Sequence, residues 1–440
     1  MSALALVARH LGVAITGCDT DTSGAADLAA LGVQVWRGHD PGHVDGARAV
    51  VVTAAVPLDH PELQRARAMA IPVVRRADAL GELVADGGGT LVAVAGTHGK
   101  TTTTVMVTDA LTAAGRTPTG LAGGRVAVWG GNARVGSRDL YVVEADEYDQ
   151  AFLALTPTVA VVNNVEADHL ECYGSLEALE AAFGEFAGRA DRVLVGADDG
   201  GATRVARALG ERVWRVGFAA DAHLRISDVE QRPEGSRARL AVPNGGAVDL
   251  RLAVPGVHNL RNGAMAVGVA VALGVPLEPV LGALARFGGV GRRFEGVGEA
   301  GGVTVVDDYA HHPTEVAATL AAARQRYPEA RLVAVFQPHL YSRTATHGDA
   351  LGIALALADL VVVTDVYGAR ERPLPGVTGQ VVARAAERAG ARTVWAPARA
   401  GLAATVAKLV RVGDVVLTLG AGDITGVGSE LLARLRGEAA

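Results

Sequence analysis

Short apolar runs alternate with alanine-rich stretches of helical period along most of the chain. A strand that is covered on both faces is apolar throughout, so these runs predict buried strands of parallel sheets. The expected strands are residues 13–17, 49–53, 91–95, 140–144, 159–163, 193–196, 303–307, 332–337, 360–364 and 415–419. Strands that alternate with helices in this way predict an α/β protein.

Changes in this pattern predict three domains. Residues 1–88 contain two or three strand–helix units, and residues 89–294 form a central α/β domain. Within the central domain, residues 221–255 alternate polar and apolar positions around a Pro-Asn-Gly-Gly turn, which predicts a small antiparallel insertion. Residues 295–440 form the third α/β unit.

The first domain begins with a helical pattern over residues 1–11, and the strand expected at residues 13–17 follows it. A nucleotide-binding α/β domain normally starts with a strand and a glycine-rich loop ahead of its first helix. We therefore expect this domain to lack its first strand and that loop. A late start codon or a truncated sequence is one explanation, and a natural domain without the loop is the other.

Composition excludes several classes of function. The net charge of −6 argues against a surface that binds nucleic acid. Only 4% of the 440 residues are aromatic while 50% are hydrophobic, so the cores must be aliphatic. The two cysteines have no CxxC spacing, and the sequence shows neither a signal peptide nor a long uncharged apolar run. These features predict a cytoplasmic protein without membrane insertion.

The strongest motif is a glycine-containing turn between the strand at 91–95 and a threonine-rich helix. The turn and the first helical residues are Gly96, Thr97, His98, Gly99, Lys100 and Thr101. Glycines and the free N–H groups of a helix N-terminus can surround phosphate closely, and a lysine adds charge. Lys100 and Lys408 are the only lysines in a chain rich in arginine. A compact ammonium suits phosphate contacts that a planar guanidinium does not, so we expect a phosphate-binding loop here, with a chance turn as the alternative.

Acidic residues cluster directly after the next predicted strand, at Glu144, Asp146, Glu147 and Asp149. Carboxylates this close repel one another unless cations lie among them. Oxygen ligands at a strand end beside a phosphate loop predict Mg²⁺, with Glu144 as the foremost ligand. A solvated acidic turn is the alternative.

Polar clusters follow three further segments. Asp168 and His169 come after the strand at 159–163, where His169 could bind a second Mg²⁺ and Asp168 could equally cap a helix. His258 and Asn262 could contact a base edge, although such residues also cap helices. Two clusters follow strands of the third domain, where open α/β sheets bind ligands; they are Asp308, Tyr309, His311 and His312, then His339 and Arg343. Helix capping and a surface salt bridge are the alternatives for these last two clusters.

Taken in order, these segments resemble the Mur ligases of peptidoglycan synthesis. The segments that carry the resemblance are residues 96–103, 144–149, 163–169, 256–262, 292–298, 307–315, 336–344 and 364–371. The resemblance implies a truncated Rossmann-like N-terminal domain for a UDP-sugar, a central phosphate-loop ATPase domain and a Rossmann-like C-terminal domain. It also implies that ATP drives ligation of L-alanine to the lactyl carboxylate of UDP-N-acetylmuramate through an acyl phosphate, with Mg²⁺ as cofactor.

The resemblance also implies roles for individual residues. The expected catalytic residues are Lys100, His169, His312 and Arg343. The expected nucleotide contacts are Gly96, Thr97, His98, Gly99, Lys100, Thr101, His258, Asn262, Asp308 and Tyr309. The expected metal ligands are Thr101, Glu144 and His169. The expected substrate contacts are Asp19, Thr53, His339 and Arg343.

Two alternatives remain at this level. A recycling ligase that joins a whole tripeptide to the same sugar nucleotide shares most of these motifs. A nucleotide-binding regulator with a degenerate ligase fold would fit the missing N-terminal loop, although the intact acids and Lys100 argue against it. If that loop is needed for the substrate, the chain as written should bind the UDP-sugar poorly.

Overall fold

The structure is a computed structural model that describes residues 1–243, 245–369 and 371–438. Asn244 in the predicted hairpin turn and Arg370 in the segment 364–371 lie outside the described residues. The chain divides into two compact units. The first unit comprises Met1–Asp228, Ala238–Arg251 and Arg261–Arg286. The second comprises Val229–Arg237, Leu252–Leu260 and Phe287–Ala440.

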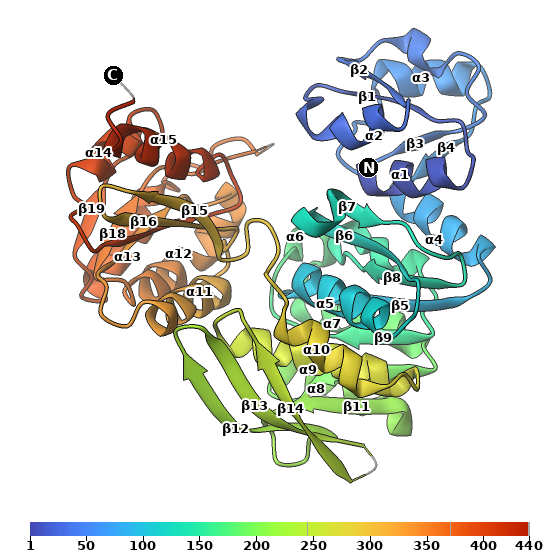
Figure 1. The fold of residues 1–440 in the computed structure, drawn as a ribbon. Helices are drawn as coiled ribbons and strands as arrows, with labels where there is room; N and C mark the ends of the chain where they lie inside the picture. The colour runs from blue at the N-terminus through green and yellow to red at the C-terminus, as the bar shows by residue number, and fades with distance from the viewer. Residues whose placement is uncertain (244, 370, 439–440) are drawn as a thin grey trace. The chain divides into compact units, whose positions relative to one another are not determined.

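The N-terminal part of the first unit contains two small parallel sheets, each of two strands (Figure 1). The expected first helix is confirmed as α1, and the strand expected at 13–17 was placed too early, because Val13 and Ala14 are exposed and pairing with β2 starts only at Thr16. The strands are β1 (Thr16–Asp19), β2 (Gln34–Arg37), β3 (Val50–Val52) and β4 (Val73–Arg75). The helices are α1 (Ser2–His10), α2 (Ala26–Ala30), α3 (Pro61–Ala68) and α4 (Arg76–Asp86), with 3-10 turns η1 (Ser23–Ala25) and η2 (Pro41–Val44).

A ten-stranded sheet follows, in the order β14-β13-β12-β11-β10-β9-β5-β8-β6-β7. Its inner strands are parallel, as predicted, and β7 at one edge is antiparallel to β6. The parallel strands and their edge partner are β5 (Thr90–Ala95), β6 (Thr119–Val126), β7 (Gly131–Arg134), β8 (Leu140–Glu144), β9 (Val159–Val162), β10 (Arg192–Gly196) and β11 (Val213–Gly217).

Helices cover both faces of these parallel strands, which explains why the strands are apolar throughout. Alternate residues of β5 illustrate this: Ala93 packs in a core with Phe183 and Phe186 of α7, while Val92 and Val94 are equally buried on the opposite face. The helices are α5 (Lys100–Ala113), α6 (Leu170–Tyr173), α7 (Leu176–Gly188), α8 (Gly200–Arg207), α9 (Val257–Ala272) and α10 (Leu277–Ala285). The 3-10 turns are η3 (Ala127–Trp129), η4 (Tyr148–Ala154) and η5 (Gly210–Arg212).

The insertion predicted at 221–255 is confirmed as three successive strands at the other edge of the sheet. They are β12 (Leu224–Arg232), β13 (Gly235–Val242) and β14 (Gly246–Leu252). Because only two residues join β12 to β13, these neighbouring strands must run antiparallel.

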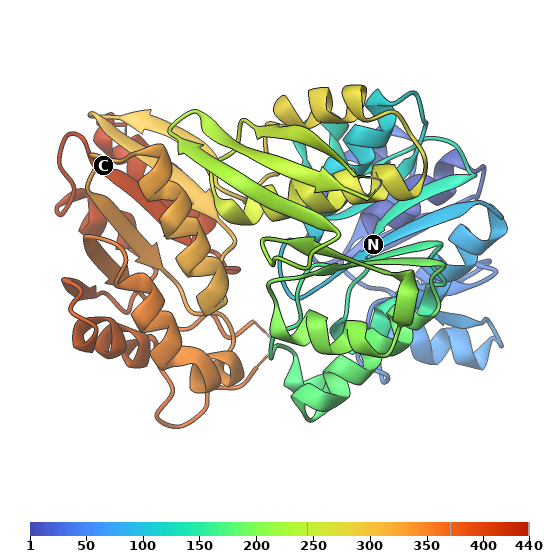
Figure 2. The same ribbon diagram turned by 90° about the horizontal axis from the view of Figure 1, so that it is seen from below.

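The second unit is built on a six-stranded sheet in the order β15-β16-β20-β17-β18-β19, in which only β15 is antiparallel to its neighbour. Two separate, mostly aliphatic cores lie on its two faces, one under α11–α13 and one under α14 and α15. Figure 2 shows the helices of this unit beside its sheet. The strands are β15 (Glu295–Ala300), β16 (Val303–Asp308), β17 (Leu332–Phe336), β18 (Leu360–Val363), β19 (Thr393–Trp395) and β20 (Val415–Leu419). The helices are α11 (Pro313–Arg326), α12 (Tyr341–Leu355), α13 (Gly379–Arg388), α14 (Leu402–Ala407) and α15 (Thr425–Leu435).

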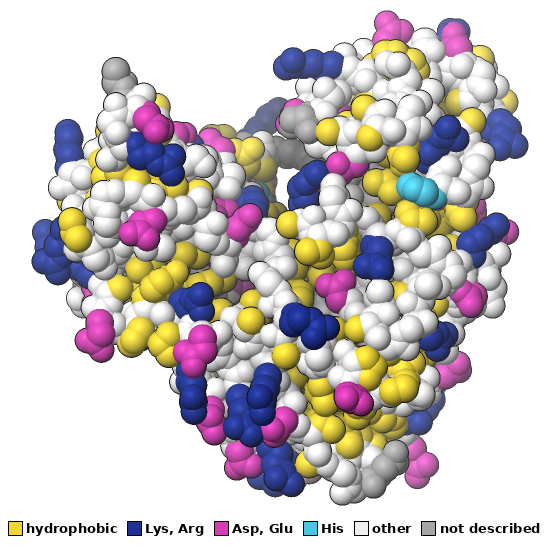
Figure 3. Space-filling model, viewed as in Figure 1, with side chains coloured by type: hydrophobic (Ala, Val, Ile, Leu, Met, Phe, Trp, Pro, Cys, Tyr) yellow, Lys and Arg dark blue, Asp and Glu magenta, His cyan; other side chains and the backbone are white. Residues whose placement is uncertain are grey.

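Charged side chains of both signs are interspersed over the face drawn in Figure 3, as the small net charge leads us to expect. Within the described part of the chain, no helix is long and apolar enough to cross a membrane.

Candidate active site

The predicted phosphate loop connects the central strand β5 to the N-terminus of α5. Gly96 and Gly99 both have positive φ, +135° and +78°, which suits glycine and turns the chain sharply into the helix. A β-carbon on Gly96 would lie 3.0 Å from the backbone nitrogen of Asn163, so the loop also needs glycine for close packing. The loop therefore has the geometry expected of a backbone that surrounds an anion.

Two neighbouring asparagines after β9 hold this loop in place. The amide oxygen of Asn164 accepts the N–H of His98 at 2.7 Å. The amide nitrogen of Asn163 donates to the carbonyl of His98 at 3.2 Å and to the hydroxyl of Thr103 at 3.1 Å. The loop is thus held in place by side chains of the protein itself, which lowers the entropy cost of binding.

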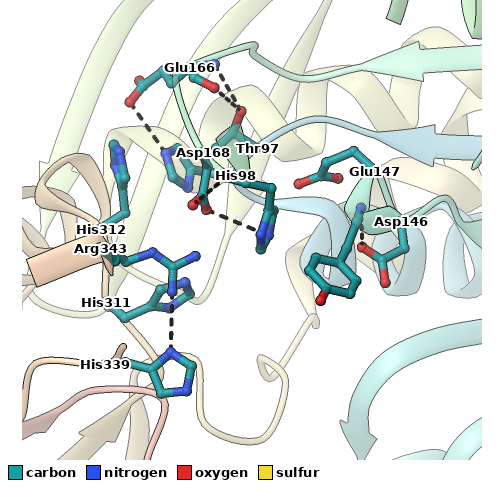
Figure 4. Close-up of polar contacts among 12 residues, drawn as sticks. Thr97, His98, Asp146, Glu147, Glu166, Asp168, His311, His312, His339 and Arg343 are labelled. Carbon is teal, nitrogen blue, oxygen red and sulfur yellow. Dashed lines mark hydrogen bonds and ion pairs between the residues drawn. The ribbon is translucent and has the colours of Figure 1, made fainter. Parts of the chain in front are cut away.

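Thr97 and His98 extend this bracing to Glu166 (Figure 4). The hydroxyl of Thr97 accepts the backbone N–H of Glu166 at 2.9 Å, and His98 Nε2 lies 3.4 Å from the Glu166 carboxylate. Both side chains therefore connect the loop to the segment after β9 in this structure.

Lys100 is folded back over its own loop and paired with Glu147. Its Nζ lies 2.7 Å from Glu147 Oε1 and donates to the carbonyls of Gly96 at 2.6 Å and Thr97 at 3.2 Å. Burial alone would lower the pKa of Lys100, but Glu147 and the nearby carboxylates of Asp146 and Glu144 raise it above its ordinary value. Lys100 is therefore a firmly charged ammonium.

Glu147 is only 2% exposed, and its second carboxylate oxygen, Oε2, is buried without a hydrogen-bond partner. Burial raises the pKa of Glu147, while Lys100 opposes the shift. A half-satisfied buried carboxylate is costly, so this oxygen is suited to a further cation.

Glu144 is the last residue of β8, and its carboxylate lies against Gly123 of β6, where no side chain intervenes. Its Oε2 accepts the N–H of Gly123 at 2.5 Å, and a β-carbon on Gly123 would collide with the same carboxylate. This contact fixes Glu144 near Lys100, whose pKa it helps to raise.

His169 lies at the start of α6 with a left-handed backbone, φ +54°. Its ring contacts the ring of Tyr148 from the acidic turn, with 5.1 Å between centroids. The alternative role of Asp168 was to cap a helix. In the structure His169 occupies the cap position of α6 instead. Asp168 Oδ1 accepts the backbone N–H of His169 at 2.9 Å. The structure thus brings His169 to the acidic turn, and its role as a metal ligand stays a prediction.

Asn262 lies on α9, far from the phosphate loop in sequence, but its side chain lies next to that loop in space. Its amide oxygen lies 2.7 Å from the position that a β-carbon on Gly99 would take. His258 lies in the first turn of the same helix. Asn262, which is expected to contact the nucleotide, therefore lies next to the phosphate loop.

Oxygen donors around the loop fit a hard divalent cation. Thr101 opens α5 and is 5% exposed, Glu144 and Glu147 supply carboxylates close to Lys100, and the unpartnered Glu147 Oε2 lies among them. Magnesium binds such oxygen ligands, so these residues fit the expected ion.

Asp308 is the last residue of β16 in the second unit, and Tyr309 follows it; residues that precede β15 hold both in place. Asp308 accepts the N–H groups of Phe294 at 2.7 Å and Ala310 at 2.8 Å. Burial raises the pKa of Asp308 to about 6, although Arg293 and these two N–H groups favour the charged form. The guanidiniums of Arg292 and Arg293 lie over the Tyr309 ring at 4.9 and 5.3 Å.

His312 is the N-cap of α11 and forms a capping box with Glu315. Its Nδ1 accepts the N–H of Thr314 at 3.4 Å, and its ring lies 5.0 Å from that of His347. The capping role that the sequence left as an alternative is therefore present, and a catalytic role for His312 stays a prediction.

Arg343 lies in the first turn of α12 and is 7% exposed. Its guanidinium contacts His339 Nδ1 at 3.2 Å (Figure 4). The His339 ring in turn stacks on Tyr367 at 5.9 Å between centroids. The structure therefore brings together His339 and Arg343, the two expected substrate contacts of this unit.

The remaining expected substrate contacts end two strands of the N-terminal part. Asp19 is the last residue of β1, where its carboxylate accepts the N–H of Asp21. Thr53 follows β3, and its hydroxyl accepts the N–H of Ala55. They belong to different two-stranded sheets.

A fixed glycine loop at the end of a central parallel strand, with a charged lysine among carboxylates, defines a nucleotide-binding α/β protein of the phosphate-loop class. Comparison with known proteins identifies its family. Three family descriptions match in succession: "Mur ligase family, catalytic domain" over residues 1–87, "Mur ligase middle domain" over 94–270 and "Mur ligase, glutamate ligase domain" over 292–422. The chain belongs to the Mur ligase family, and it is an enzyme of the ligase class.

Two curated relatives and two solved structures show the degree of similarity. A UDP-N-acetylmuramate–L-alanine ligase of Kineococcus radiotolerans is 48% identical over 98% of this chain and 93% of its own length. The same enzyme of Cutibacterium acnes is 43% identical over 100% and 94%. The UDP-N-acetylmuramate–alanine ligase structure from Thermotoga maritima matches with a TM-score of 0.85 and 29% identity, covering 99% of this chain and 96% of that one. A murein peptide ligase from Psychrobacter arcticus has the same fold, with a TM-score of 0.75, 24% identity and coverage of 100% and 97%.

These matches confirm the predicted family and the three-domain α/β fold. The domain boundaries and the roles of individual residues stay predictions.

Proposed function

We propose that this chain uses ATP to join L-alanine to the lactyl carboxylate of UDP-N-acetylmuramate. The observation that carries the proposal is the Lys100 loop: two positive-φ glycines, a charged lysine and a buried carboxylate oxygen without a partner. Curated relatives named for this reaction, 42–48% identical over nearly the whole chain, support the choice of substrates.

In the proposed mechanism, the N–H groups at the start of α5 and the ammonium of Lys100 bind the phosphates of ATP. In the structure, Lys100 donates to two loop carbonyls and to Glu147. Phosphate oxygens replace these acceptors without a net loss of hydrogen bonds. Lys100 then stabilises the negative charge that is redistributed as the γ-phosphoryl group moves.

Thr101, Glu144 and Glu147 are the residues proposed to hold Mg²⁺, and His169 is the candidate ligand for a second ion. The ion supplies charge neutralisation at the phosphate oxygens when it is bound. Glu144 is already oriented for this by the N–H of Gly123. Asn262 beside Gly99 is proposed to contact the nucleotide.

The reaction itself has two balanced steps. A lactyl carboxylate oxygen attacks the γ-phosphorus, the bond to ADP breaks, and an acyl phosphate forms. The amine of L-alanine then attacks the acyl carbon, inorganic phosphate leaves with the electron pair of the broken C–O bond, and the amine loses a proton. Arg343 is proposed to hold a substrate carboxylate, with His339 orienting its guanidinium.

Phosphate release with purified protein tests this proposal. With ATP, Mg²⁺ and UDP-N-acetylmuramate, release of phosphate should depend on L-alanine, and mass spectrometry should find the alanylated sugar nucleotide. Hydroxylamine added in place of L-alanine should trap the acyl phosphate as a hydroxamate. Turnover with a tripeptide but not with L-alanine would favour the recycling ligase instead, and ATP binding without either product would favour the regulator.

A further inference from the structure

Outside the nucleotide site, five side chains that can bind a metal gather in the N-terminal part of the chain. Cys18 lies on β1, His39 and His43 follow β2, and His60 and Glu62 lie at the start of α3. The ligase reaction proposed above uses none of them. The sequence pattern also did not predict them as a cluster, because they lie up to 44 positions apart.

Three of these side chains already have their donor atoms close together. The donor atoms of Cys18, His39 and Glu62 all lie within 4.8 Å of one another. Cys18 Sγ is 3.1 and 3.3 Å from the two oxygens of Glu62 and 3.4 Å from His39 Nδ1, which is 3.5 Å from Glu62 Oε2. A tetrahedral Zn²⁺ ion, with bonds of about 2.3 Å to sulfur and about 2.0–2.1 Å to nitrogen or oxygen, holds its ligand atoms roughly 3.3–3.6 Å apart. The distances among the three donor atoms are therefore close to those between ligand atoms in a tetrahedral zinc site.

His60 lies beside these three residues but outside the set whose donor atoms are all within 4.8 Å of one another. Its Nδ1 is buried without a hydrogen-bond partner and lies 3.8 Å from Glu62 Oε2. Its ring stands nearly perpendicular to that of His39, with 4.7 Å between centroids. A buried ring nitrogen without a partner is uncommon in folded proteins, and coordination of a metal would satisfy it.

His43 contacts the Glu62 carboxylate and is a candidate to hold it in position. Its Nδ1 lies 2.9 Å from Glu62 Oε1 and also 3.2 Å from the backbone N–H of Asp40, while its ring stacks on Trp36 at 4.5 Å. A ring that is held on several sides and touches a ligand carboxylate is typical of the outer shell of a metal site.

We propose that Cys18, His39 and Glu62 bind one Zn²⁺ ion, that the neighbouring His60 moves in to supply the fourth ligand, and that His43 positions the Glu62 carboxylate. A thiolate and two imidazoles favour a transition ion over Mg²⁺, which prefers oxygen ligands. The Cys18 thiol releases its proton to solvent when the sulfur binds the metal.

The ion would connect two parts of the fold that share no strand pairing. Cys18 and His39 belong to the β1–β2 sheet and its following loop, whereas His60 and Glu62 start the helix that joins β3 to β4. A two-stranded sheet is marginally stable by itself, so a cross-link between two such sheets stabilises both.

Cobalt substitution in the full-length protein tests the proposal directly. The protein is stripped with a chelator and then titrated with Co²⁺ in the presence of excess Mg²⁺, which competes for the oxygen-lined nucleotide site. We expect one equivalent of Co²⁺ to give the visible bands of a tetrahedral ion and a thiolate-to-cobalt charge-transfer band. Zn²⁺ should displace it stoichiometrically and raise the melting temperature.

Variants assign the ligands. Cys18→Ser should abolish the thiolate band and weaken Zn²⁺ binding more than about 100-fold, whereas His43→Ala should weaken it by only about 10–100-fold, as expected for an outer-shell residue. Cys172→Ser is the matched control, because Cys172 is the only other cysteine. It should leave both the band and the affinity unchanged.

Two results would overturn the proposal. One is a wild-type titration without a thiolate-to-cobalt band, which needs no variant to fold. The other is a band that persists in Cys18→Ser and disappears in Cys172→Ser, because the bound metal would then lie elsewhere in the chain.

Discussion

The amide oxygen of Asn262 lies 2.7 Å from the point where a β-carbon on Gly99 would stand. A helix that begins more than 150 residues later in the chain thus closes over the phosphate loop. Glycine is required at this point for two separate reasons, its positive φ and this close approach.

Gly99→Ala should therefore impair nucleotide binding. Gly115→Ala is the matched control, because Gly115 has a similar φ, +81°, and a β-carbon there meets nothing within 4 Å. Both variants should lose about 1–2 kcal/mol of stability from the left-handed alanine. Only Gly99→Ala should also weaken ATP binding, by about tenfold or more, equivalent to about 1.4 kcal/mol, in calorimetric titration. Equal ATP affinity in the two variants would show that Asn262 moves aside freely.

Lys100→Ala should lower kcat/KM by roughly 10²–10³-fold, since it removes a charge that stabilises the transferring phosphoryl group. Lys408→Ala, at the end of α14, removes the other lysine and should leave activity unchanged. Lys100→Ala should also destabilise the fold by about 3–5 kcal/mol, because Glu147 is left as a buried charge.

A double variant tests the stability effect. Adding Glu147→Gln to Lys100→Ala removes the uncompensated carboxylate, so thermal stability should recover. Activity should stay low, because the double variant lacks both the lysine and a proposed Mg²⁺ ligand. Recovery of activity together with stability would mean that Lys100 serves the fold and not the chemistry.

Asp308 should make stability depend on pH. Its pKa is about 6 in the folded chain and near 3.8 when unfolded, so the folded state binds the proton more tightly. Stability from this group is present below about pH 4 and is lost as pH rises to about 6, by up to about 3 kcal/mol. Asp308→Asn cannot titrate, so its cost in denaturant unfolding should be smaller at pH 7 than at pH 4. A cost independent of pH would contradict the raised pKa.

Arg343→Lys should raise the KM for one carboxylate substrate by about tenfold. Lysine cannot bind a carboxylate through two parallel N–H groups, so the variant loses one charge-assisted hydrogen bond to that substrate. Arg388→Lys is the control, since Arg388 pairs with Asp349 on an exposed surface of α13 and α12. The KM for ATP should stay the same in both. A drop in kcat alone would show that Arg343 acts on the transition state and not on substrate binding.

Strands with continuous apolar sequence could be predicted well. Those at 140–144 and 415–419 match β8 and β20 residue for residue. Strands β6 and β11 were missed, because β6 contains three glycines and the five residues of β11 are interrupted by Arg215 and end in a glycine. Their conformation depends on pairing with neighbours, which no local pattern reveals.

In the candidate site, too, features that are continuous in sequence could be predicted, and features that depend on distant contacts could not. The loop at 96–101 and the acidic turn could be predicted because each is continuous in sequence and follows a buried strand. The pairing of Lys100 with Glu147 and the bracing by Asn163 could not, because both depend on how distant strand ends approach one another. For the same reason, the sequence suggested Glu144 as the first partner of a cation and left Glu147 less certain.

The ion pair at Lys100 has a practical consequence for chemical labelling. An amine that is held protonated beside a carboxylate does not react with acylating reagents, which need the neutral amine. Between the two lysines, amine-directed dyes or resins should therefore attach at the exposed Lys408 and leave Lys100 unmodified. Lysine-directed attachment would then anchor the chain through α14 and leave the ATP pocket free.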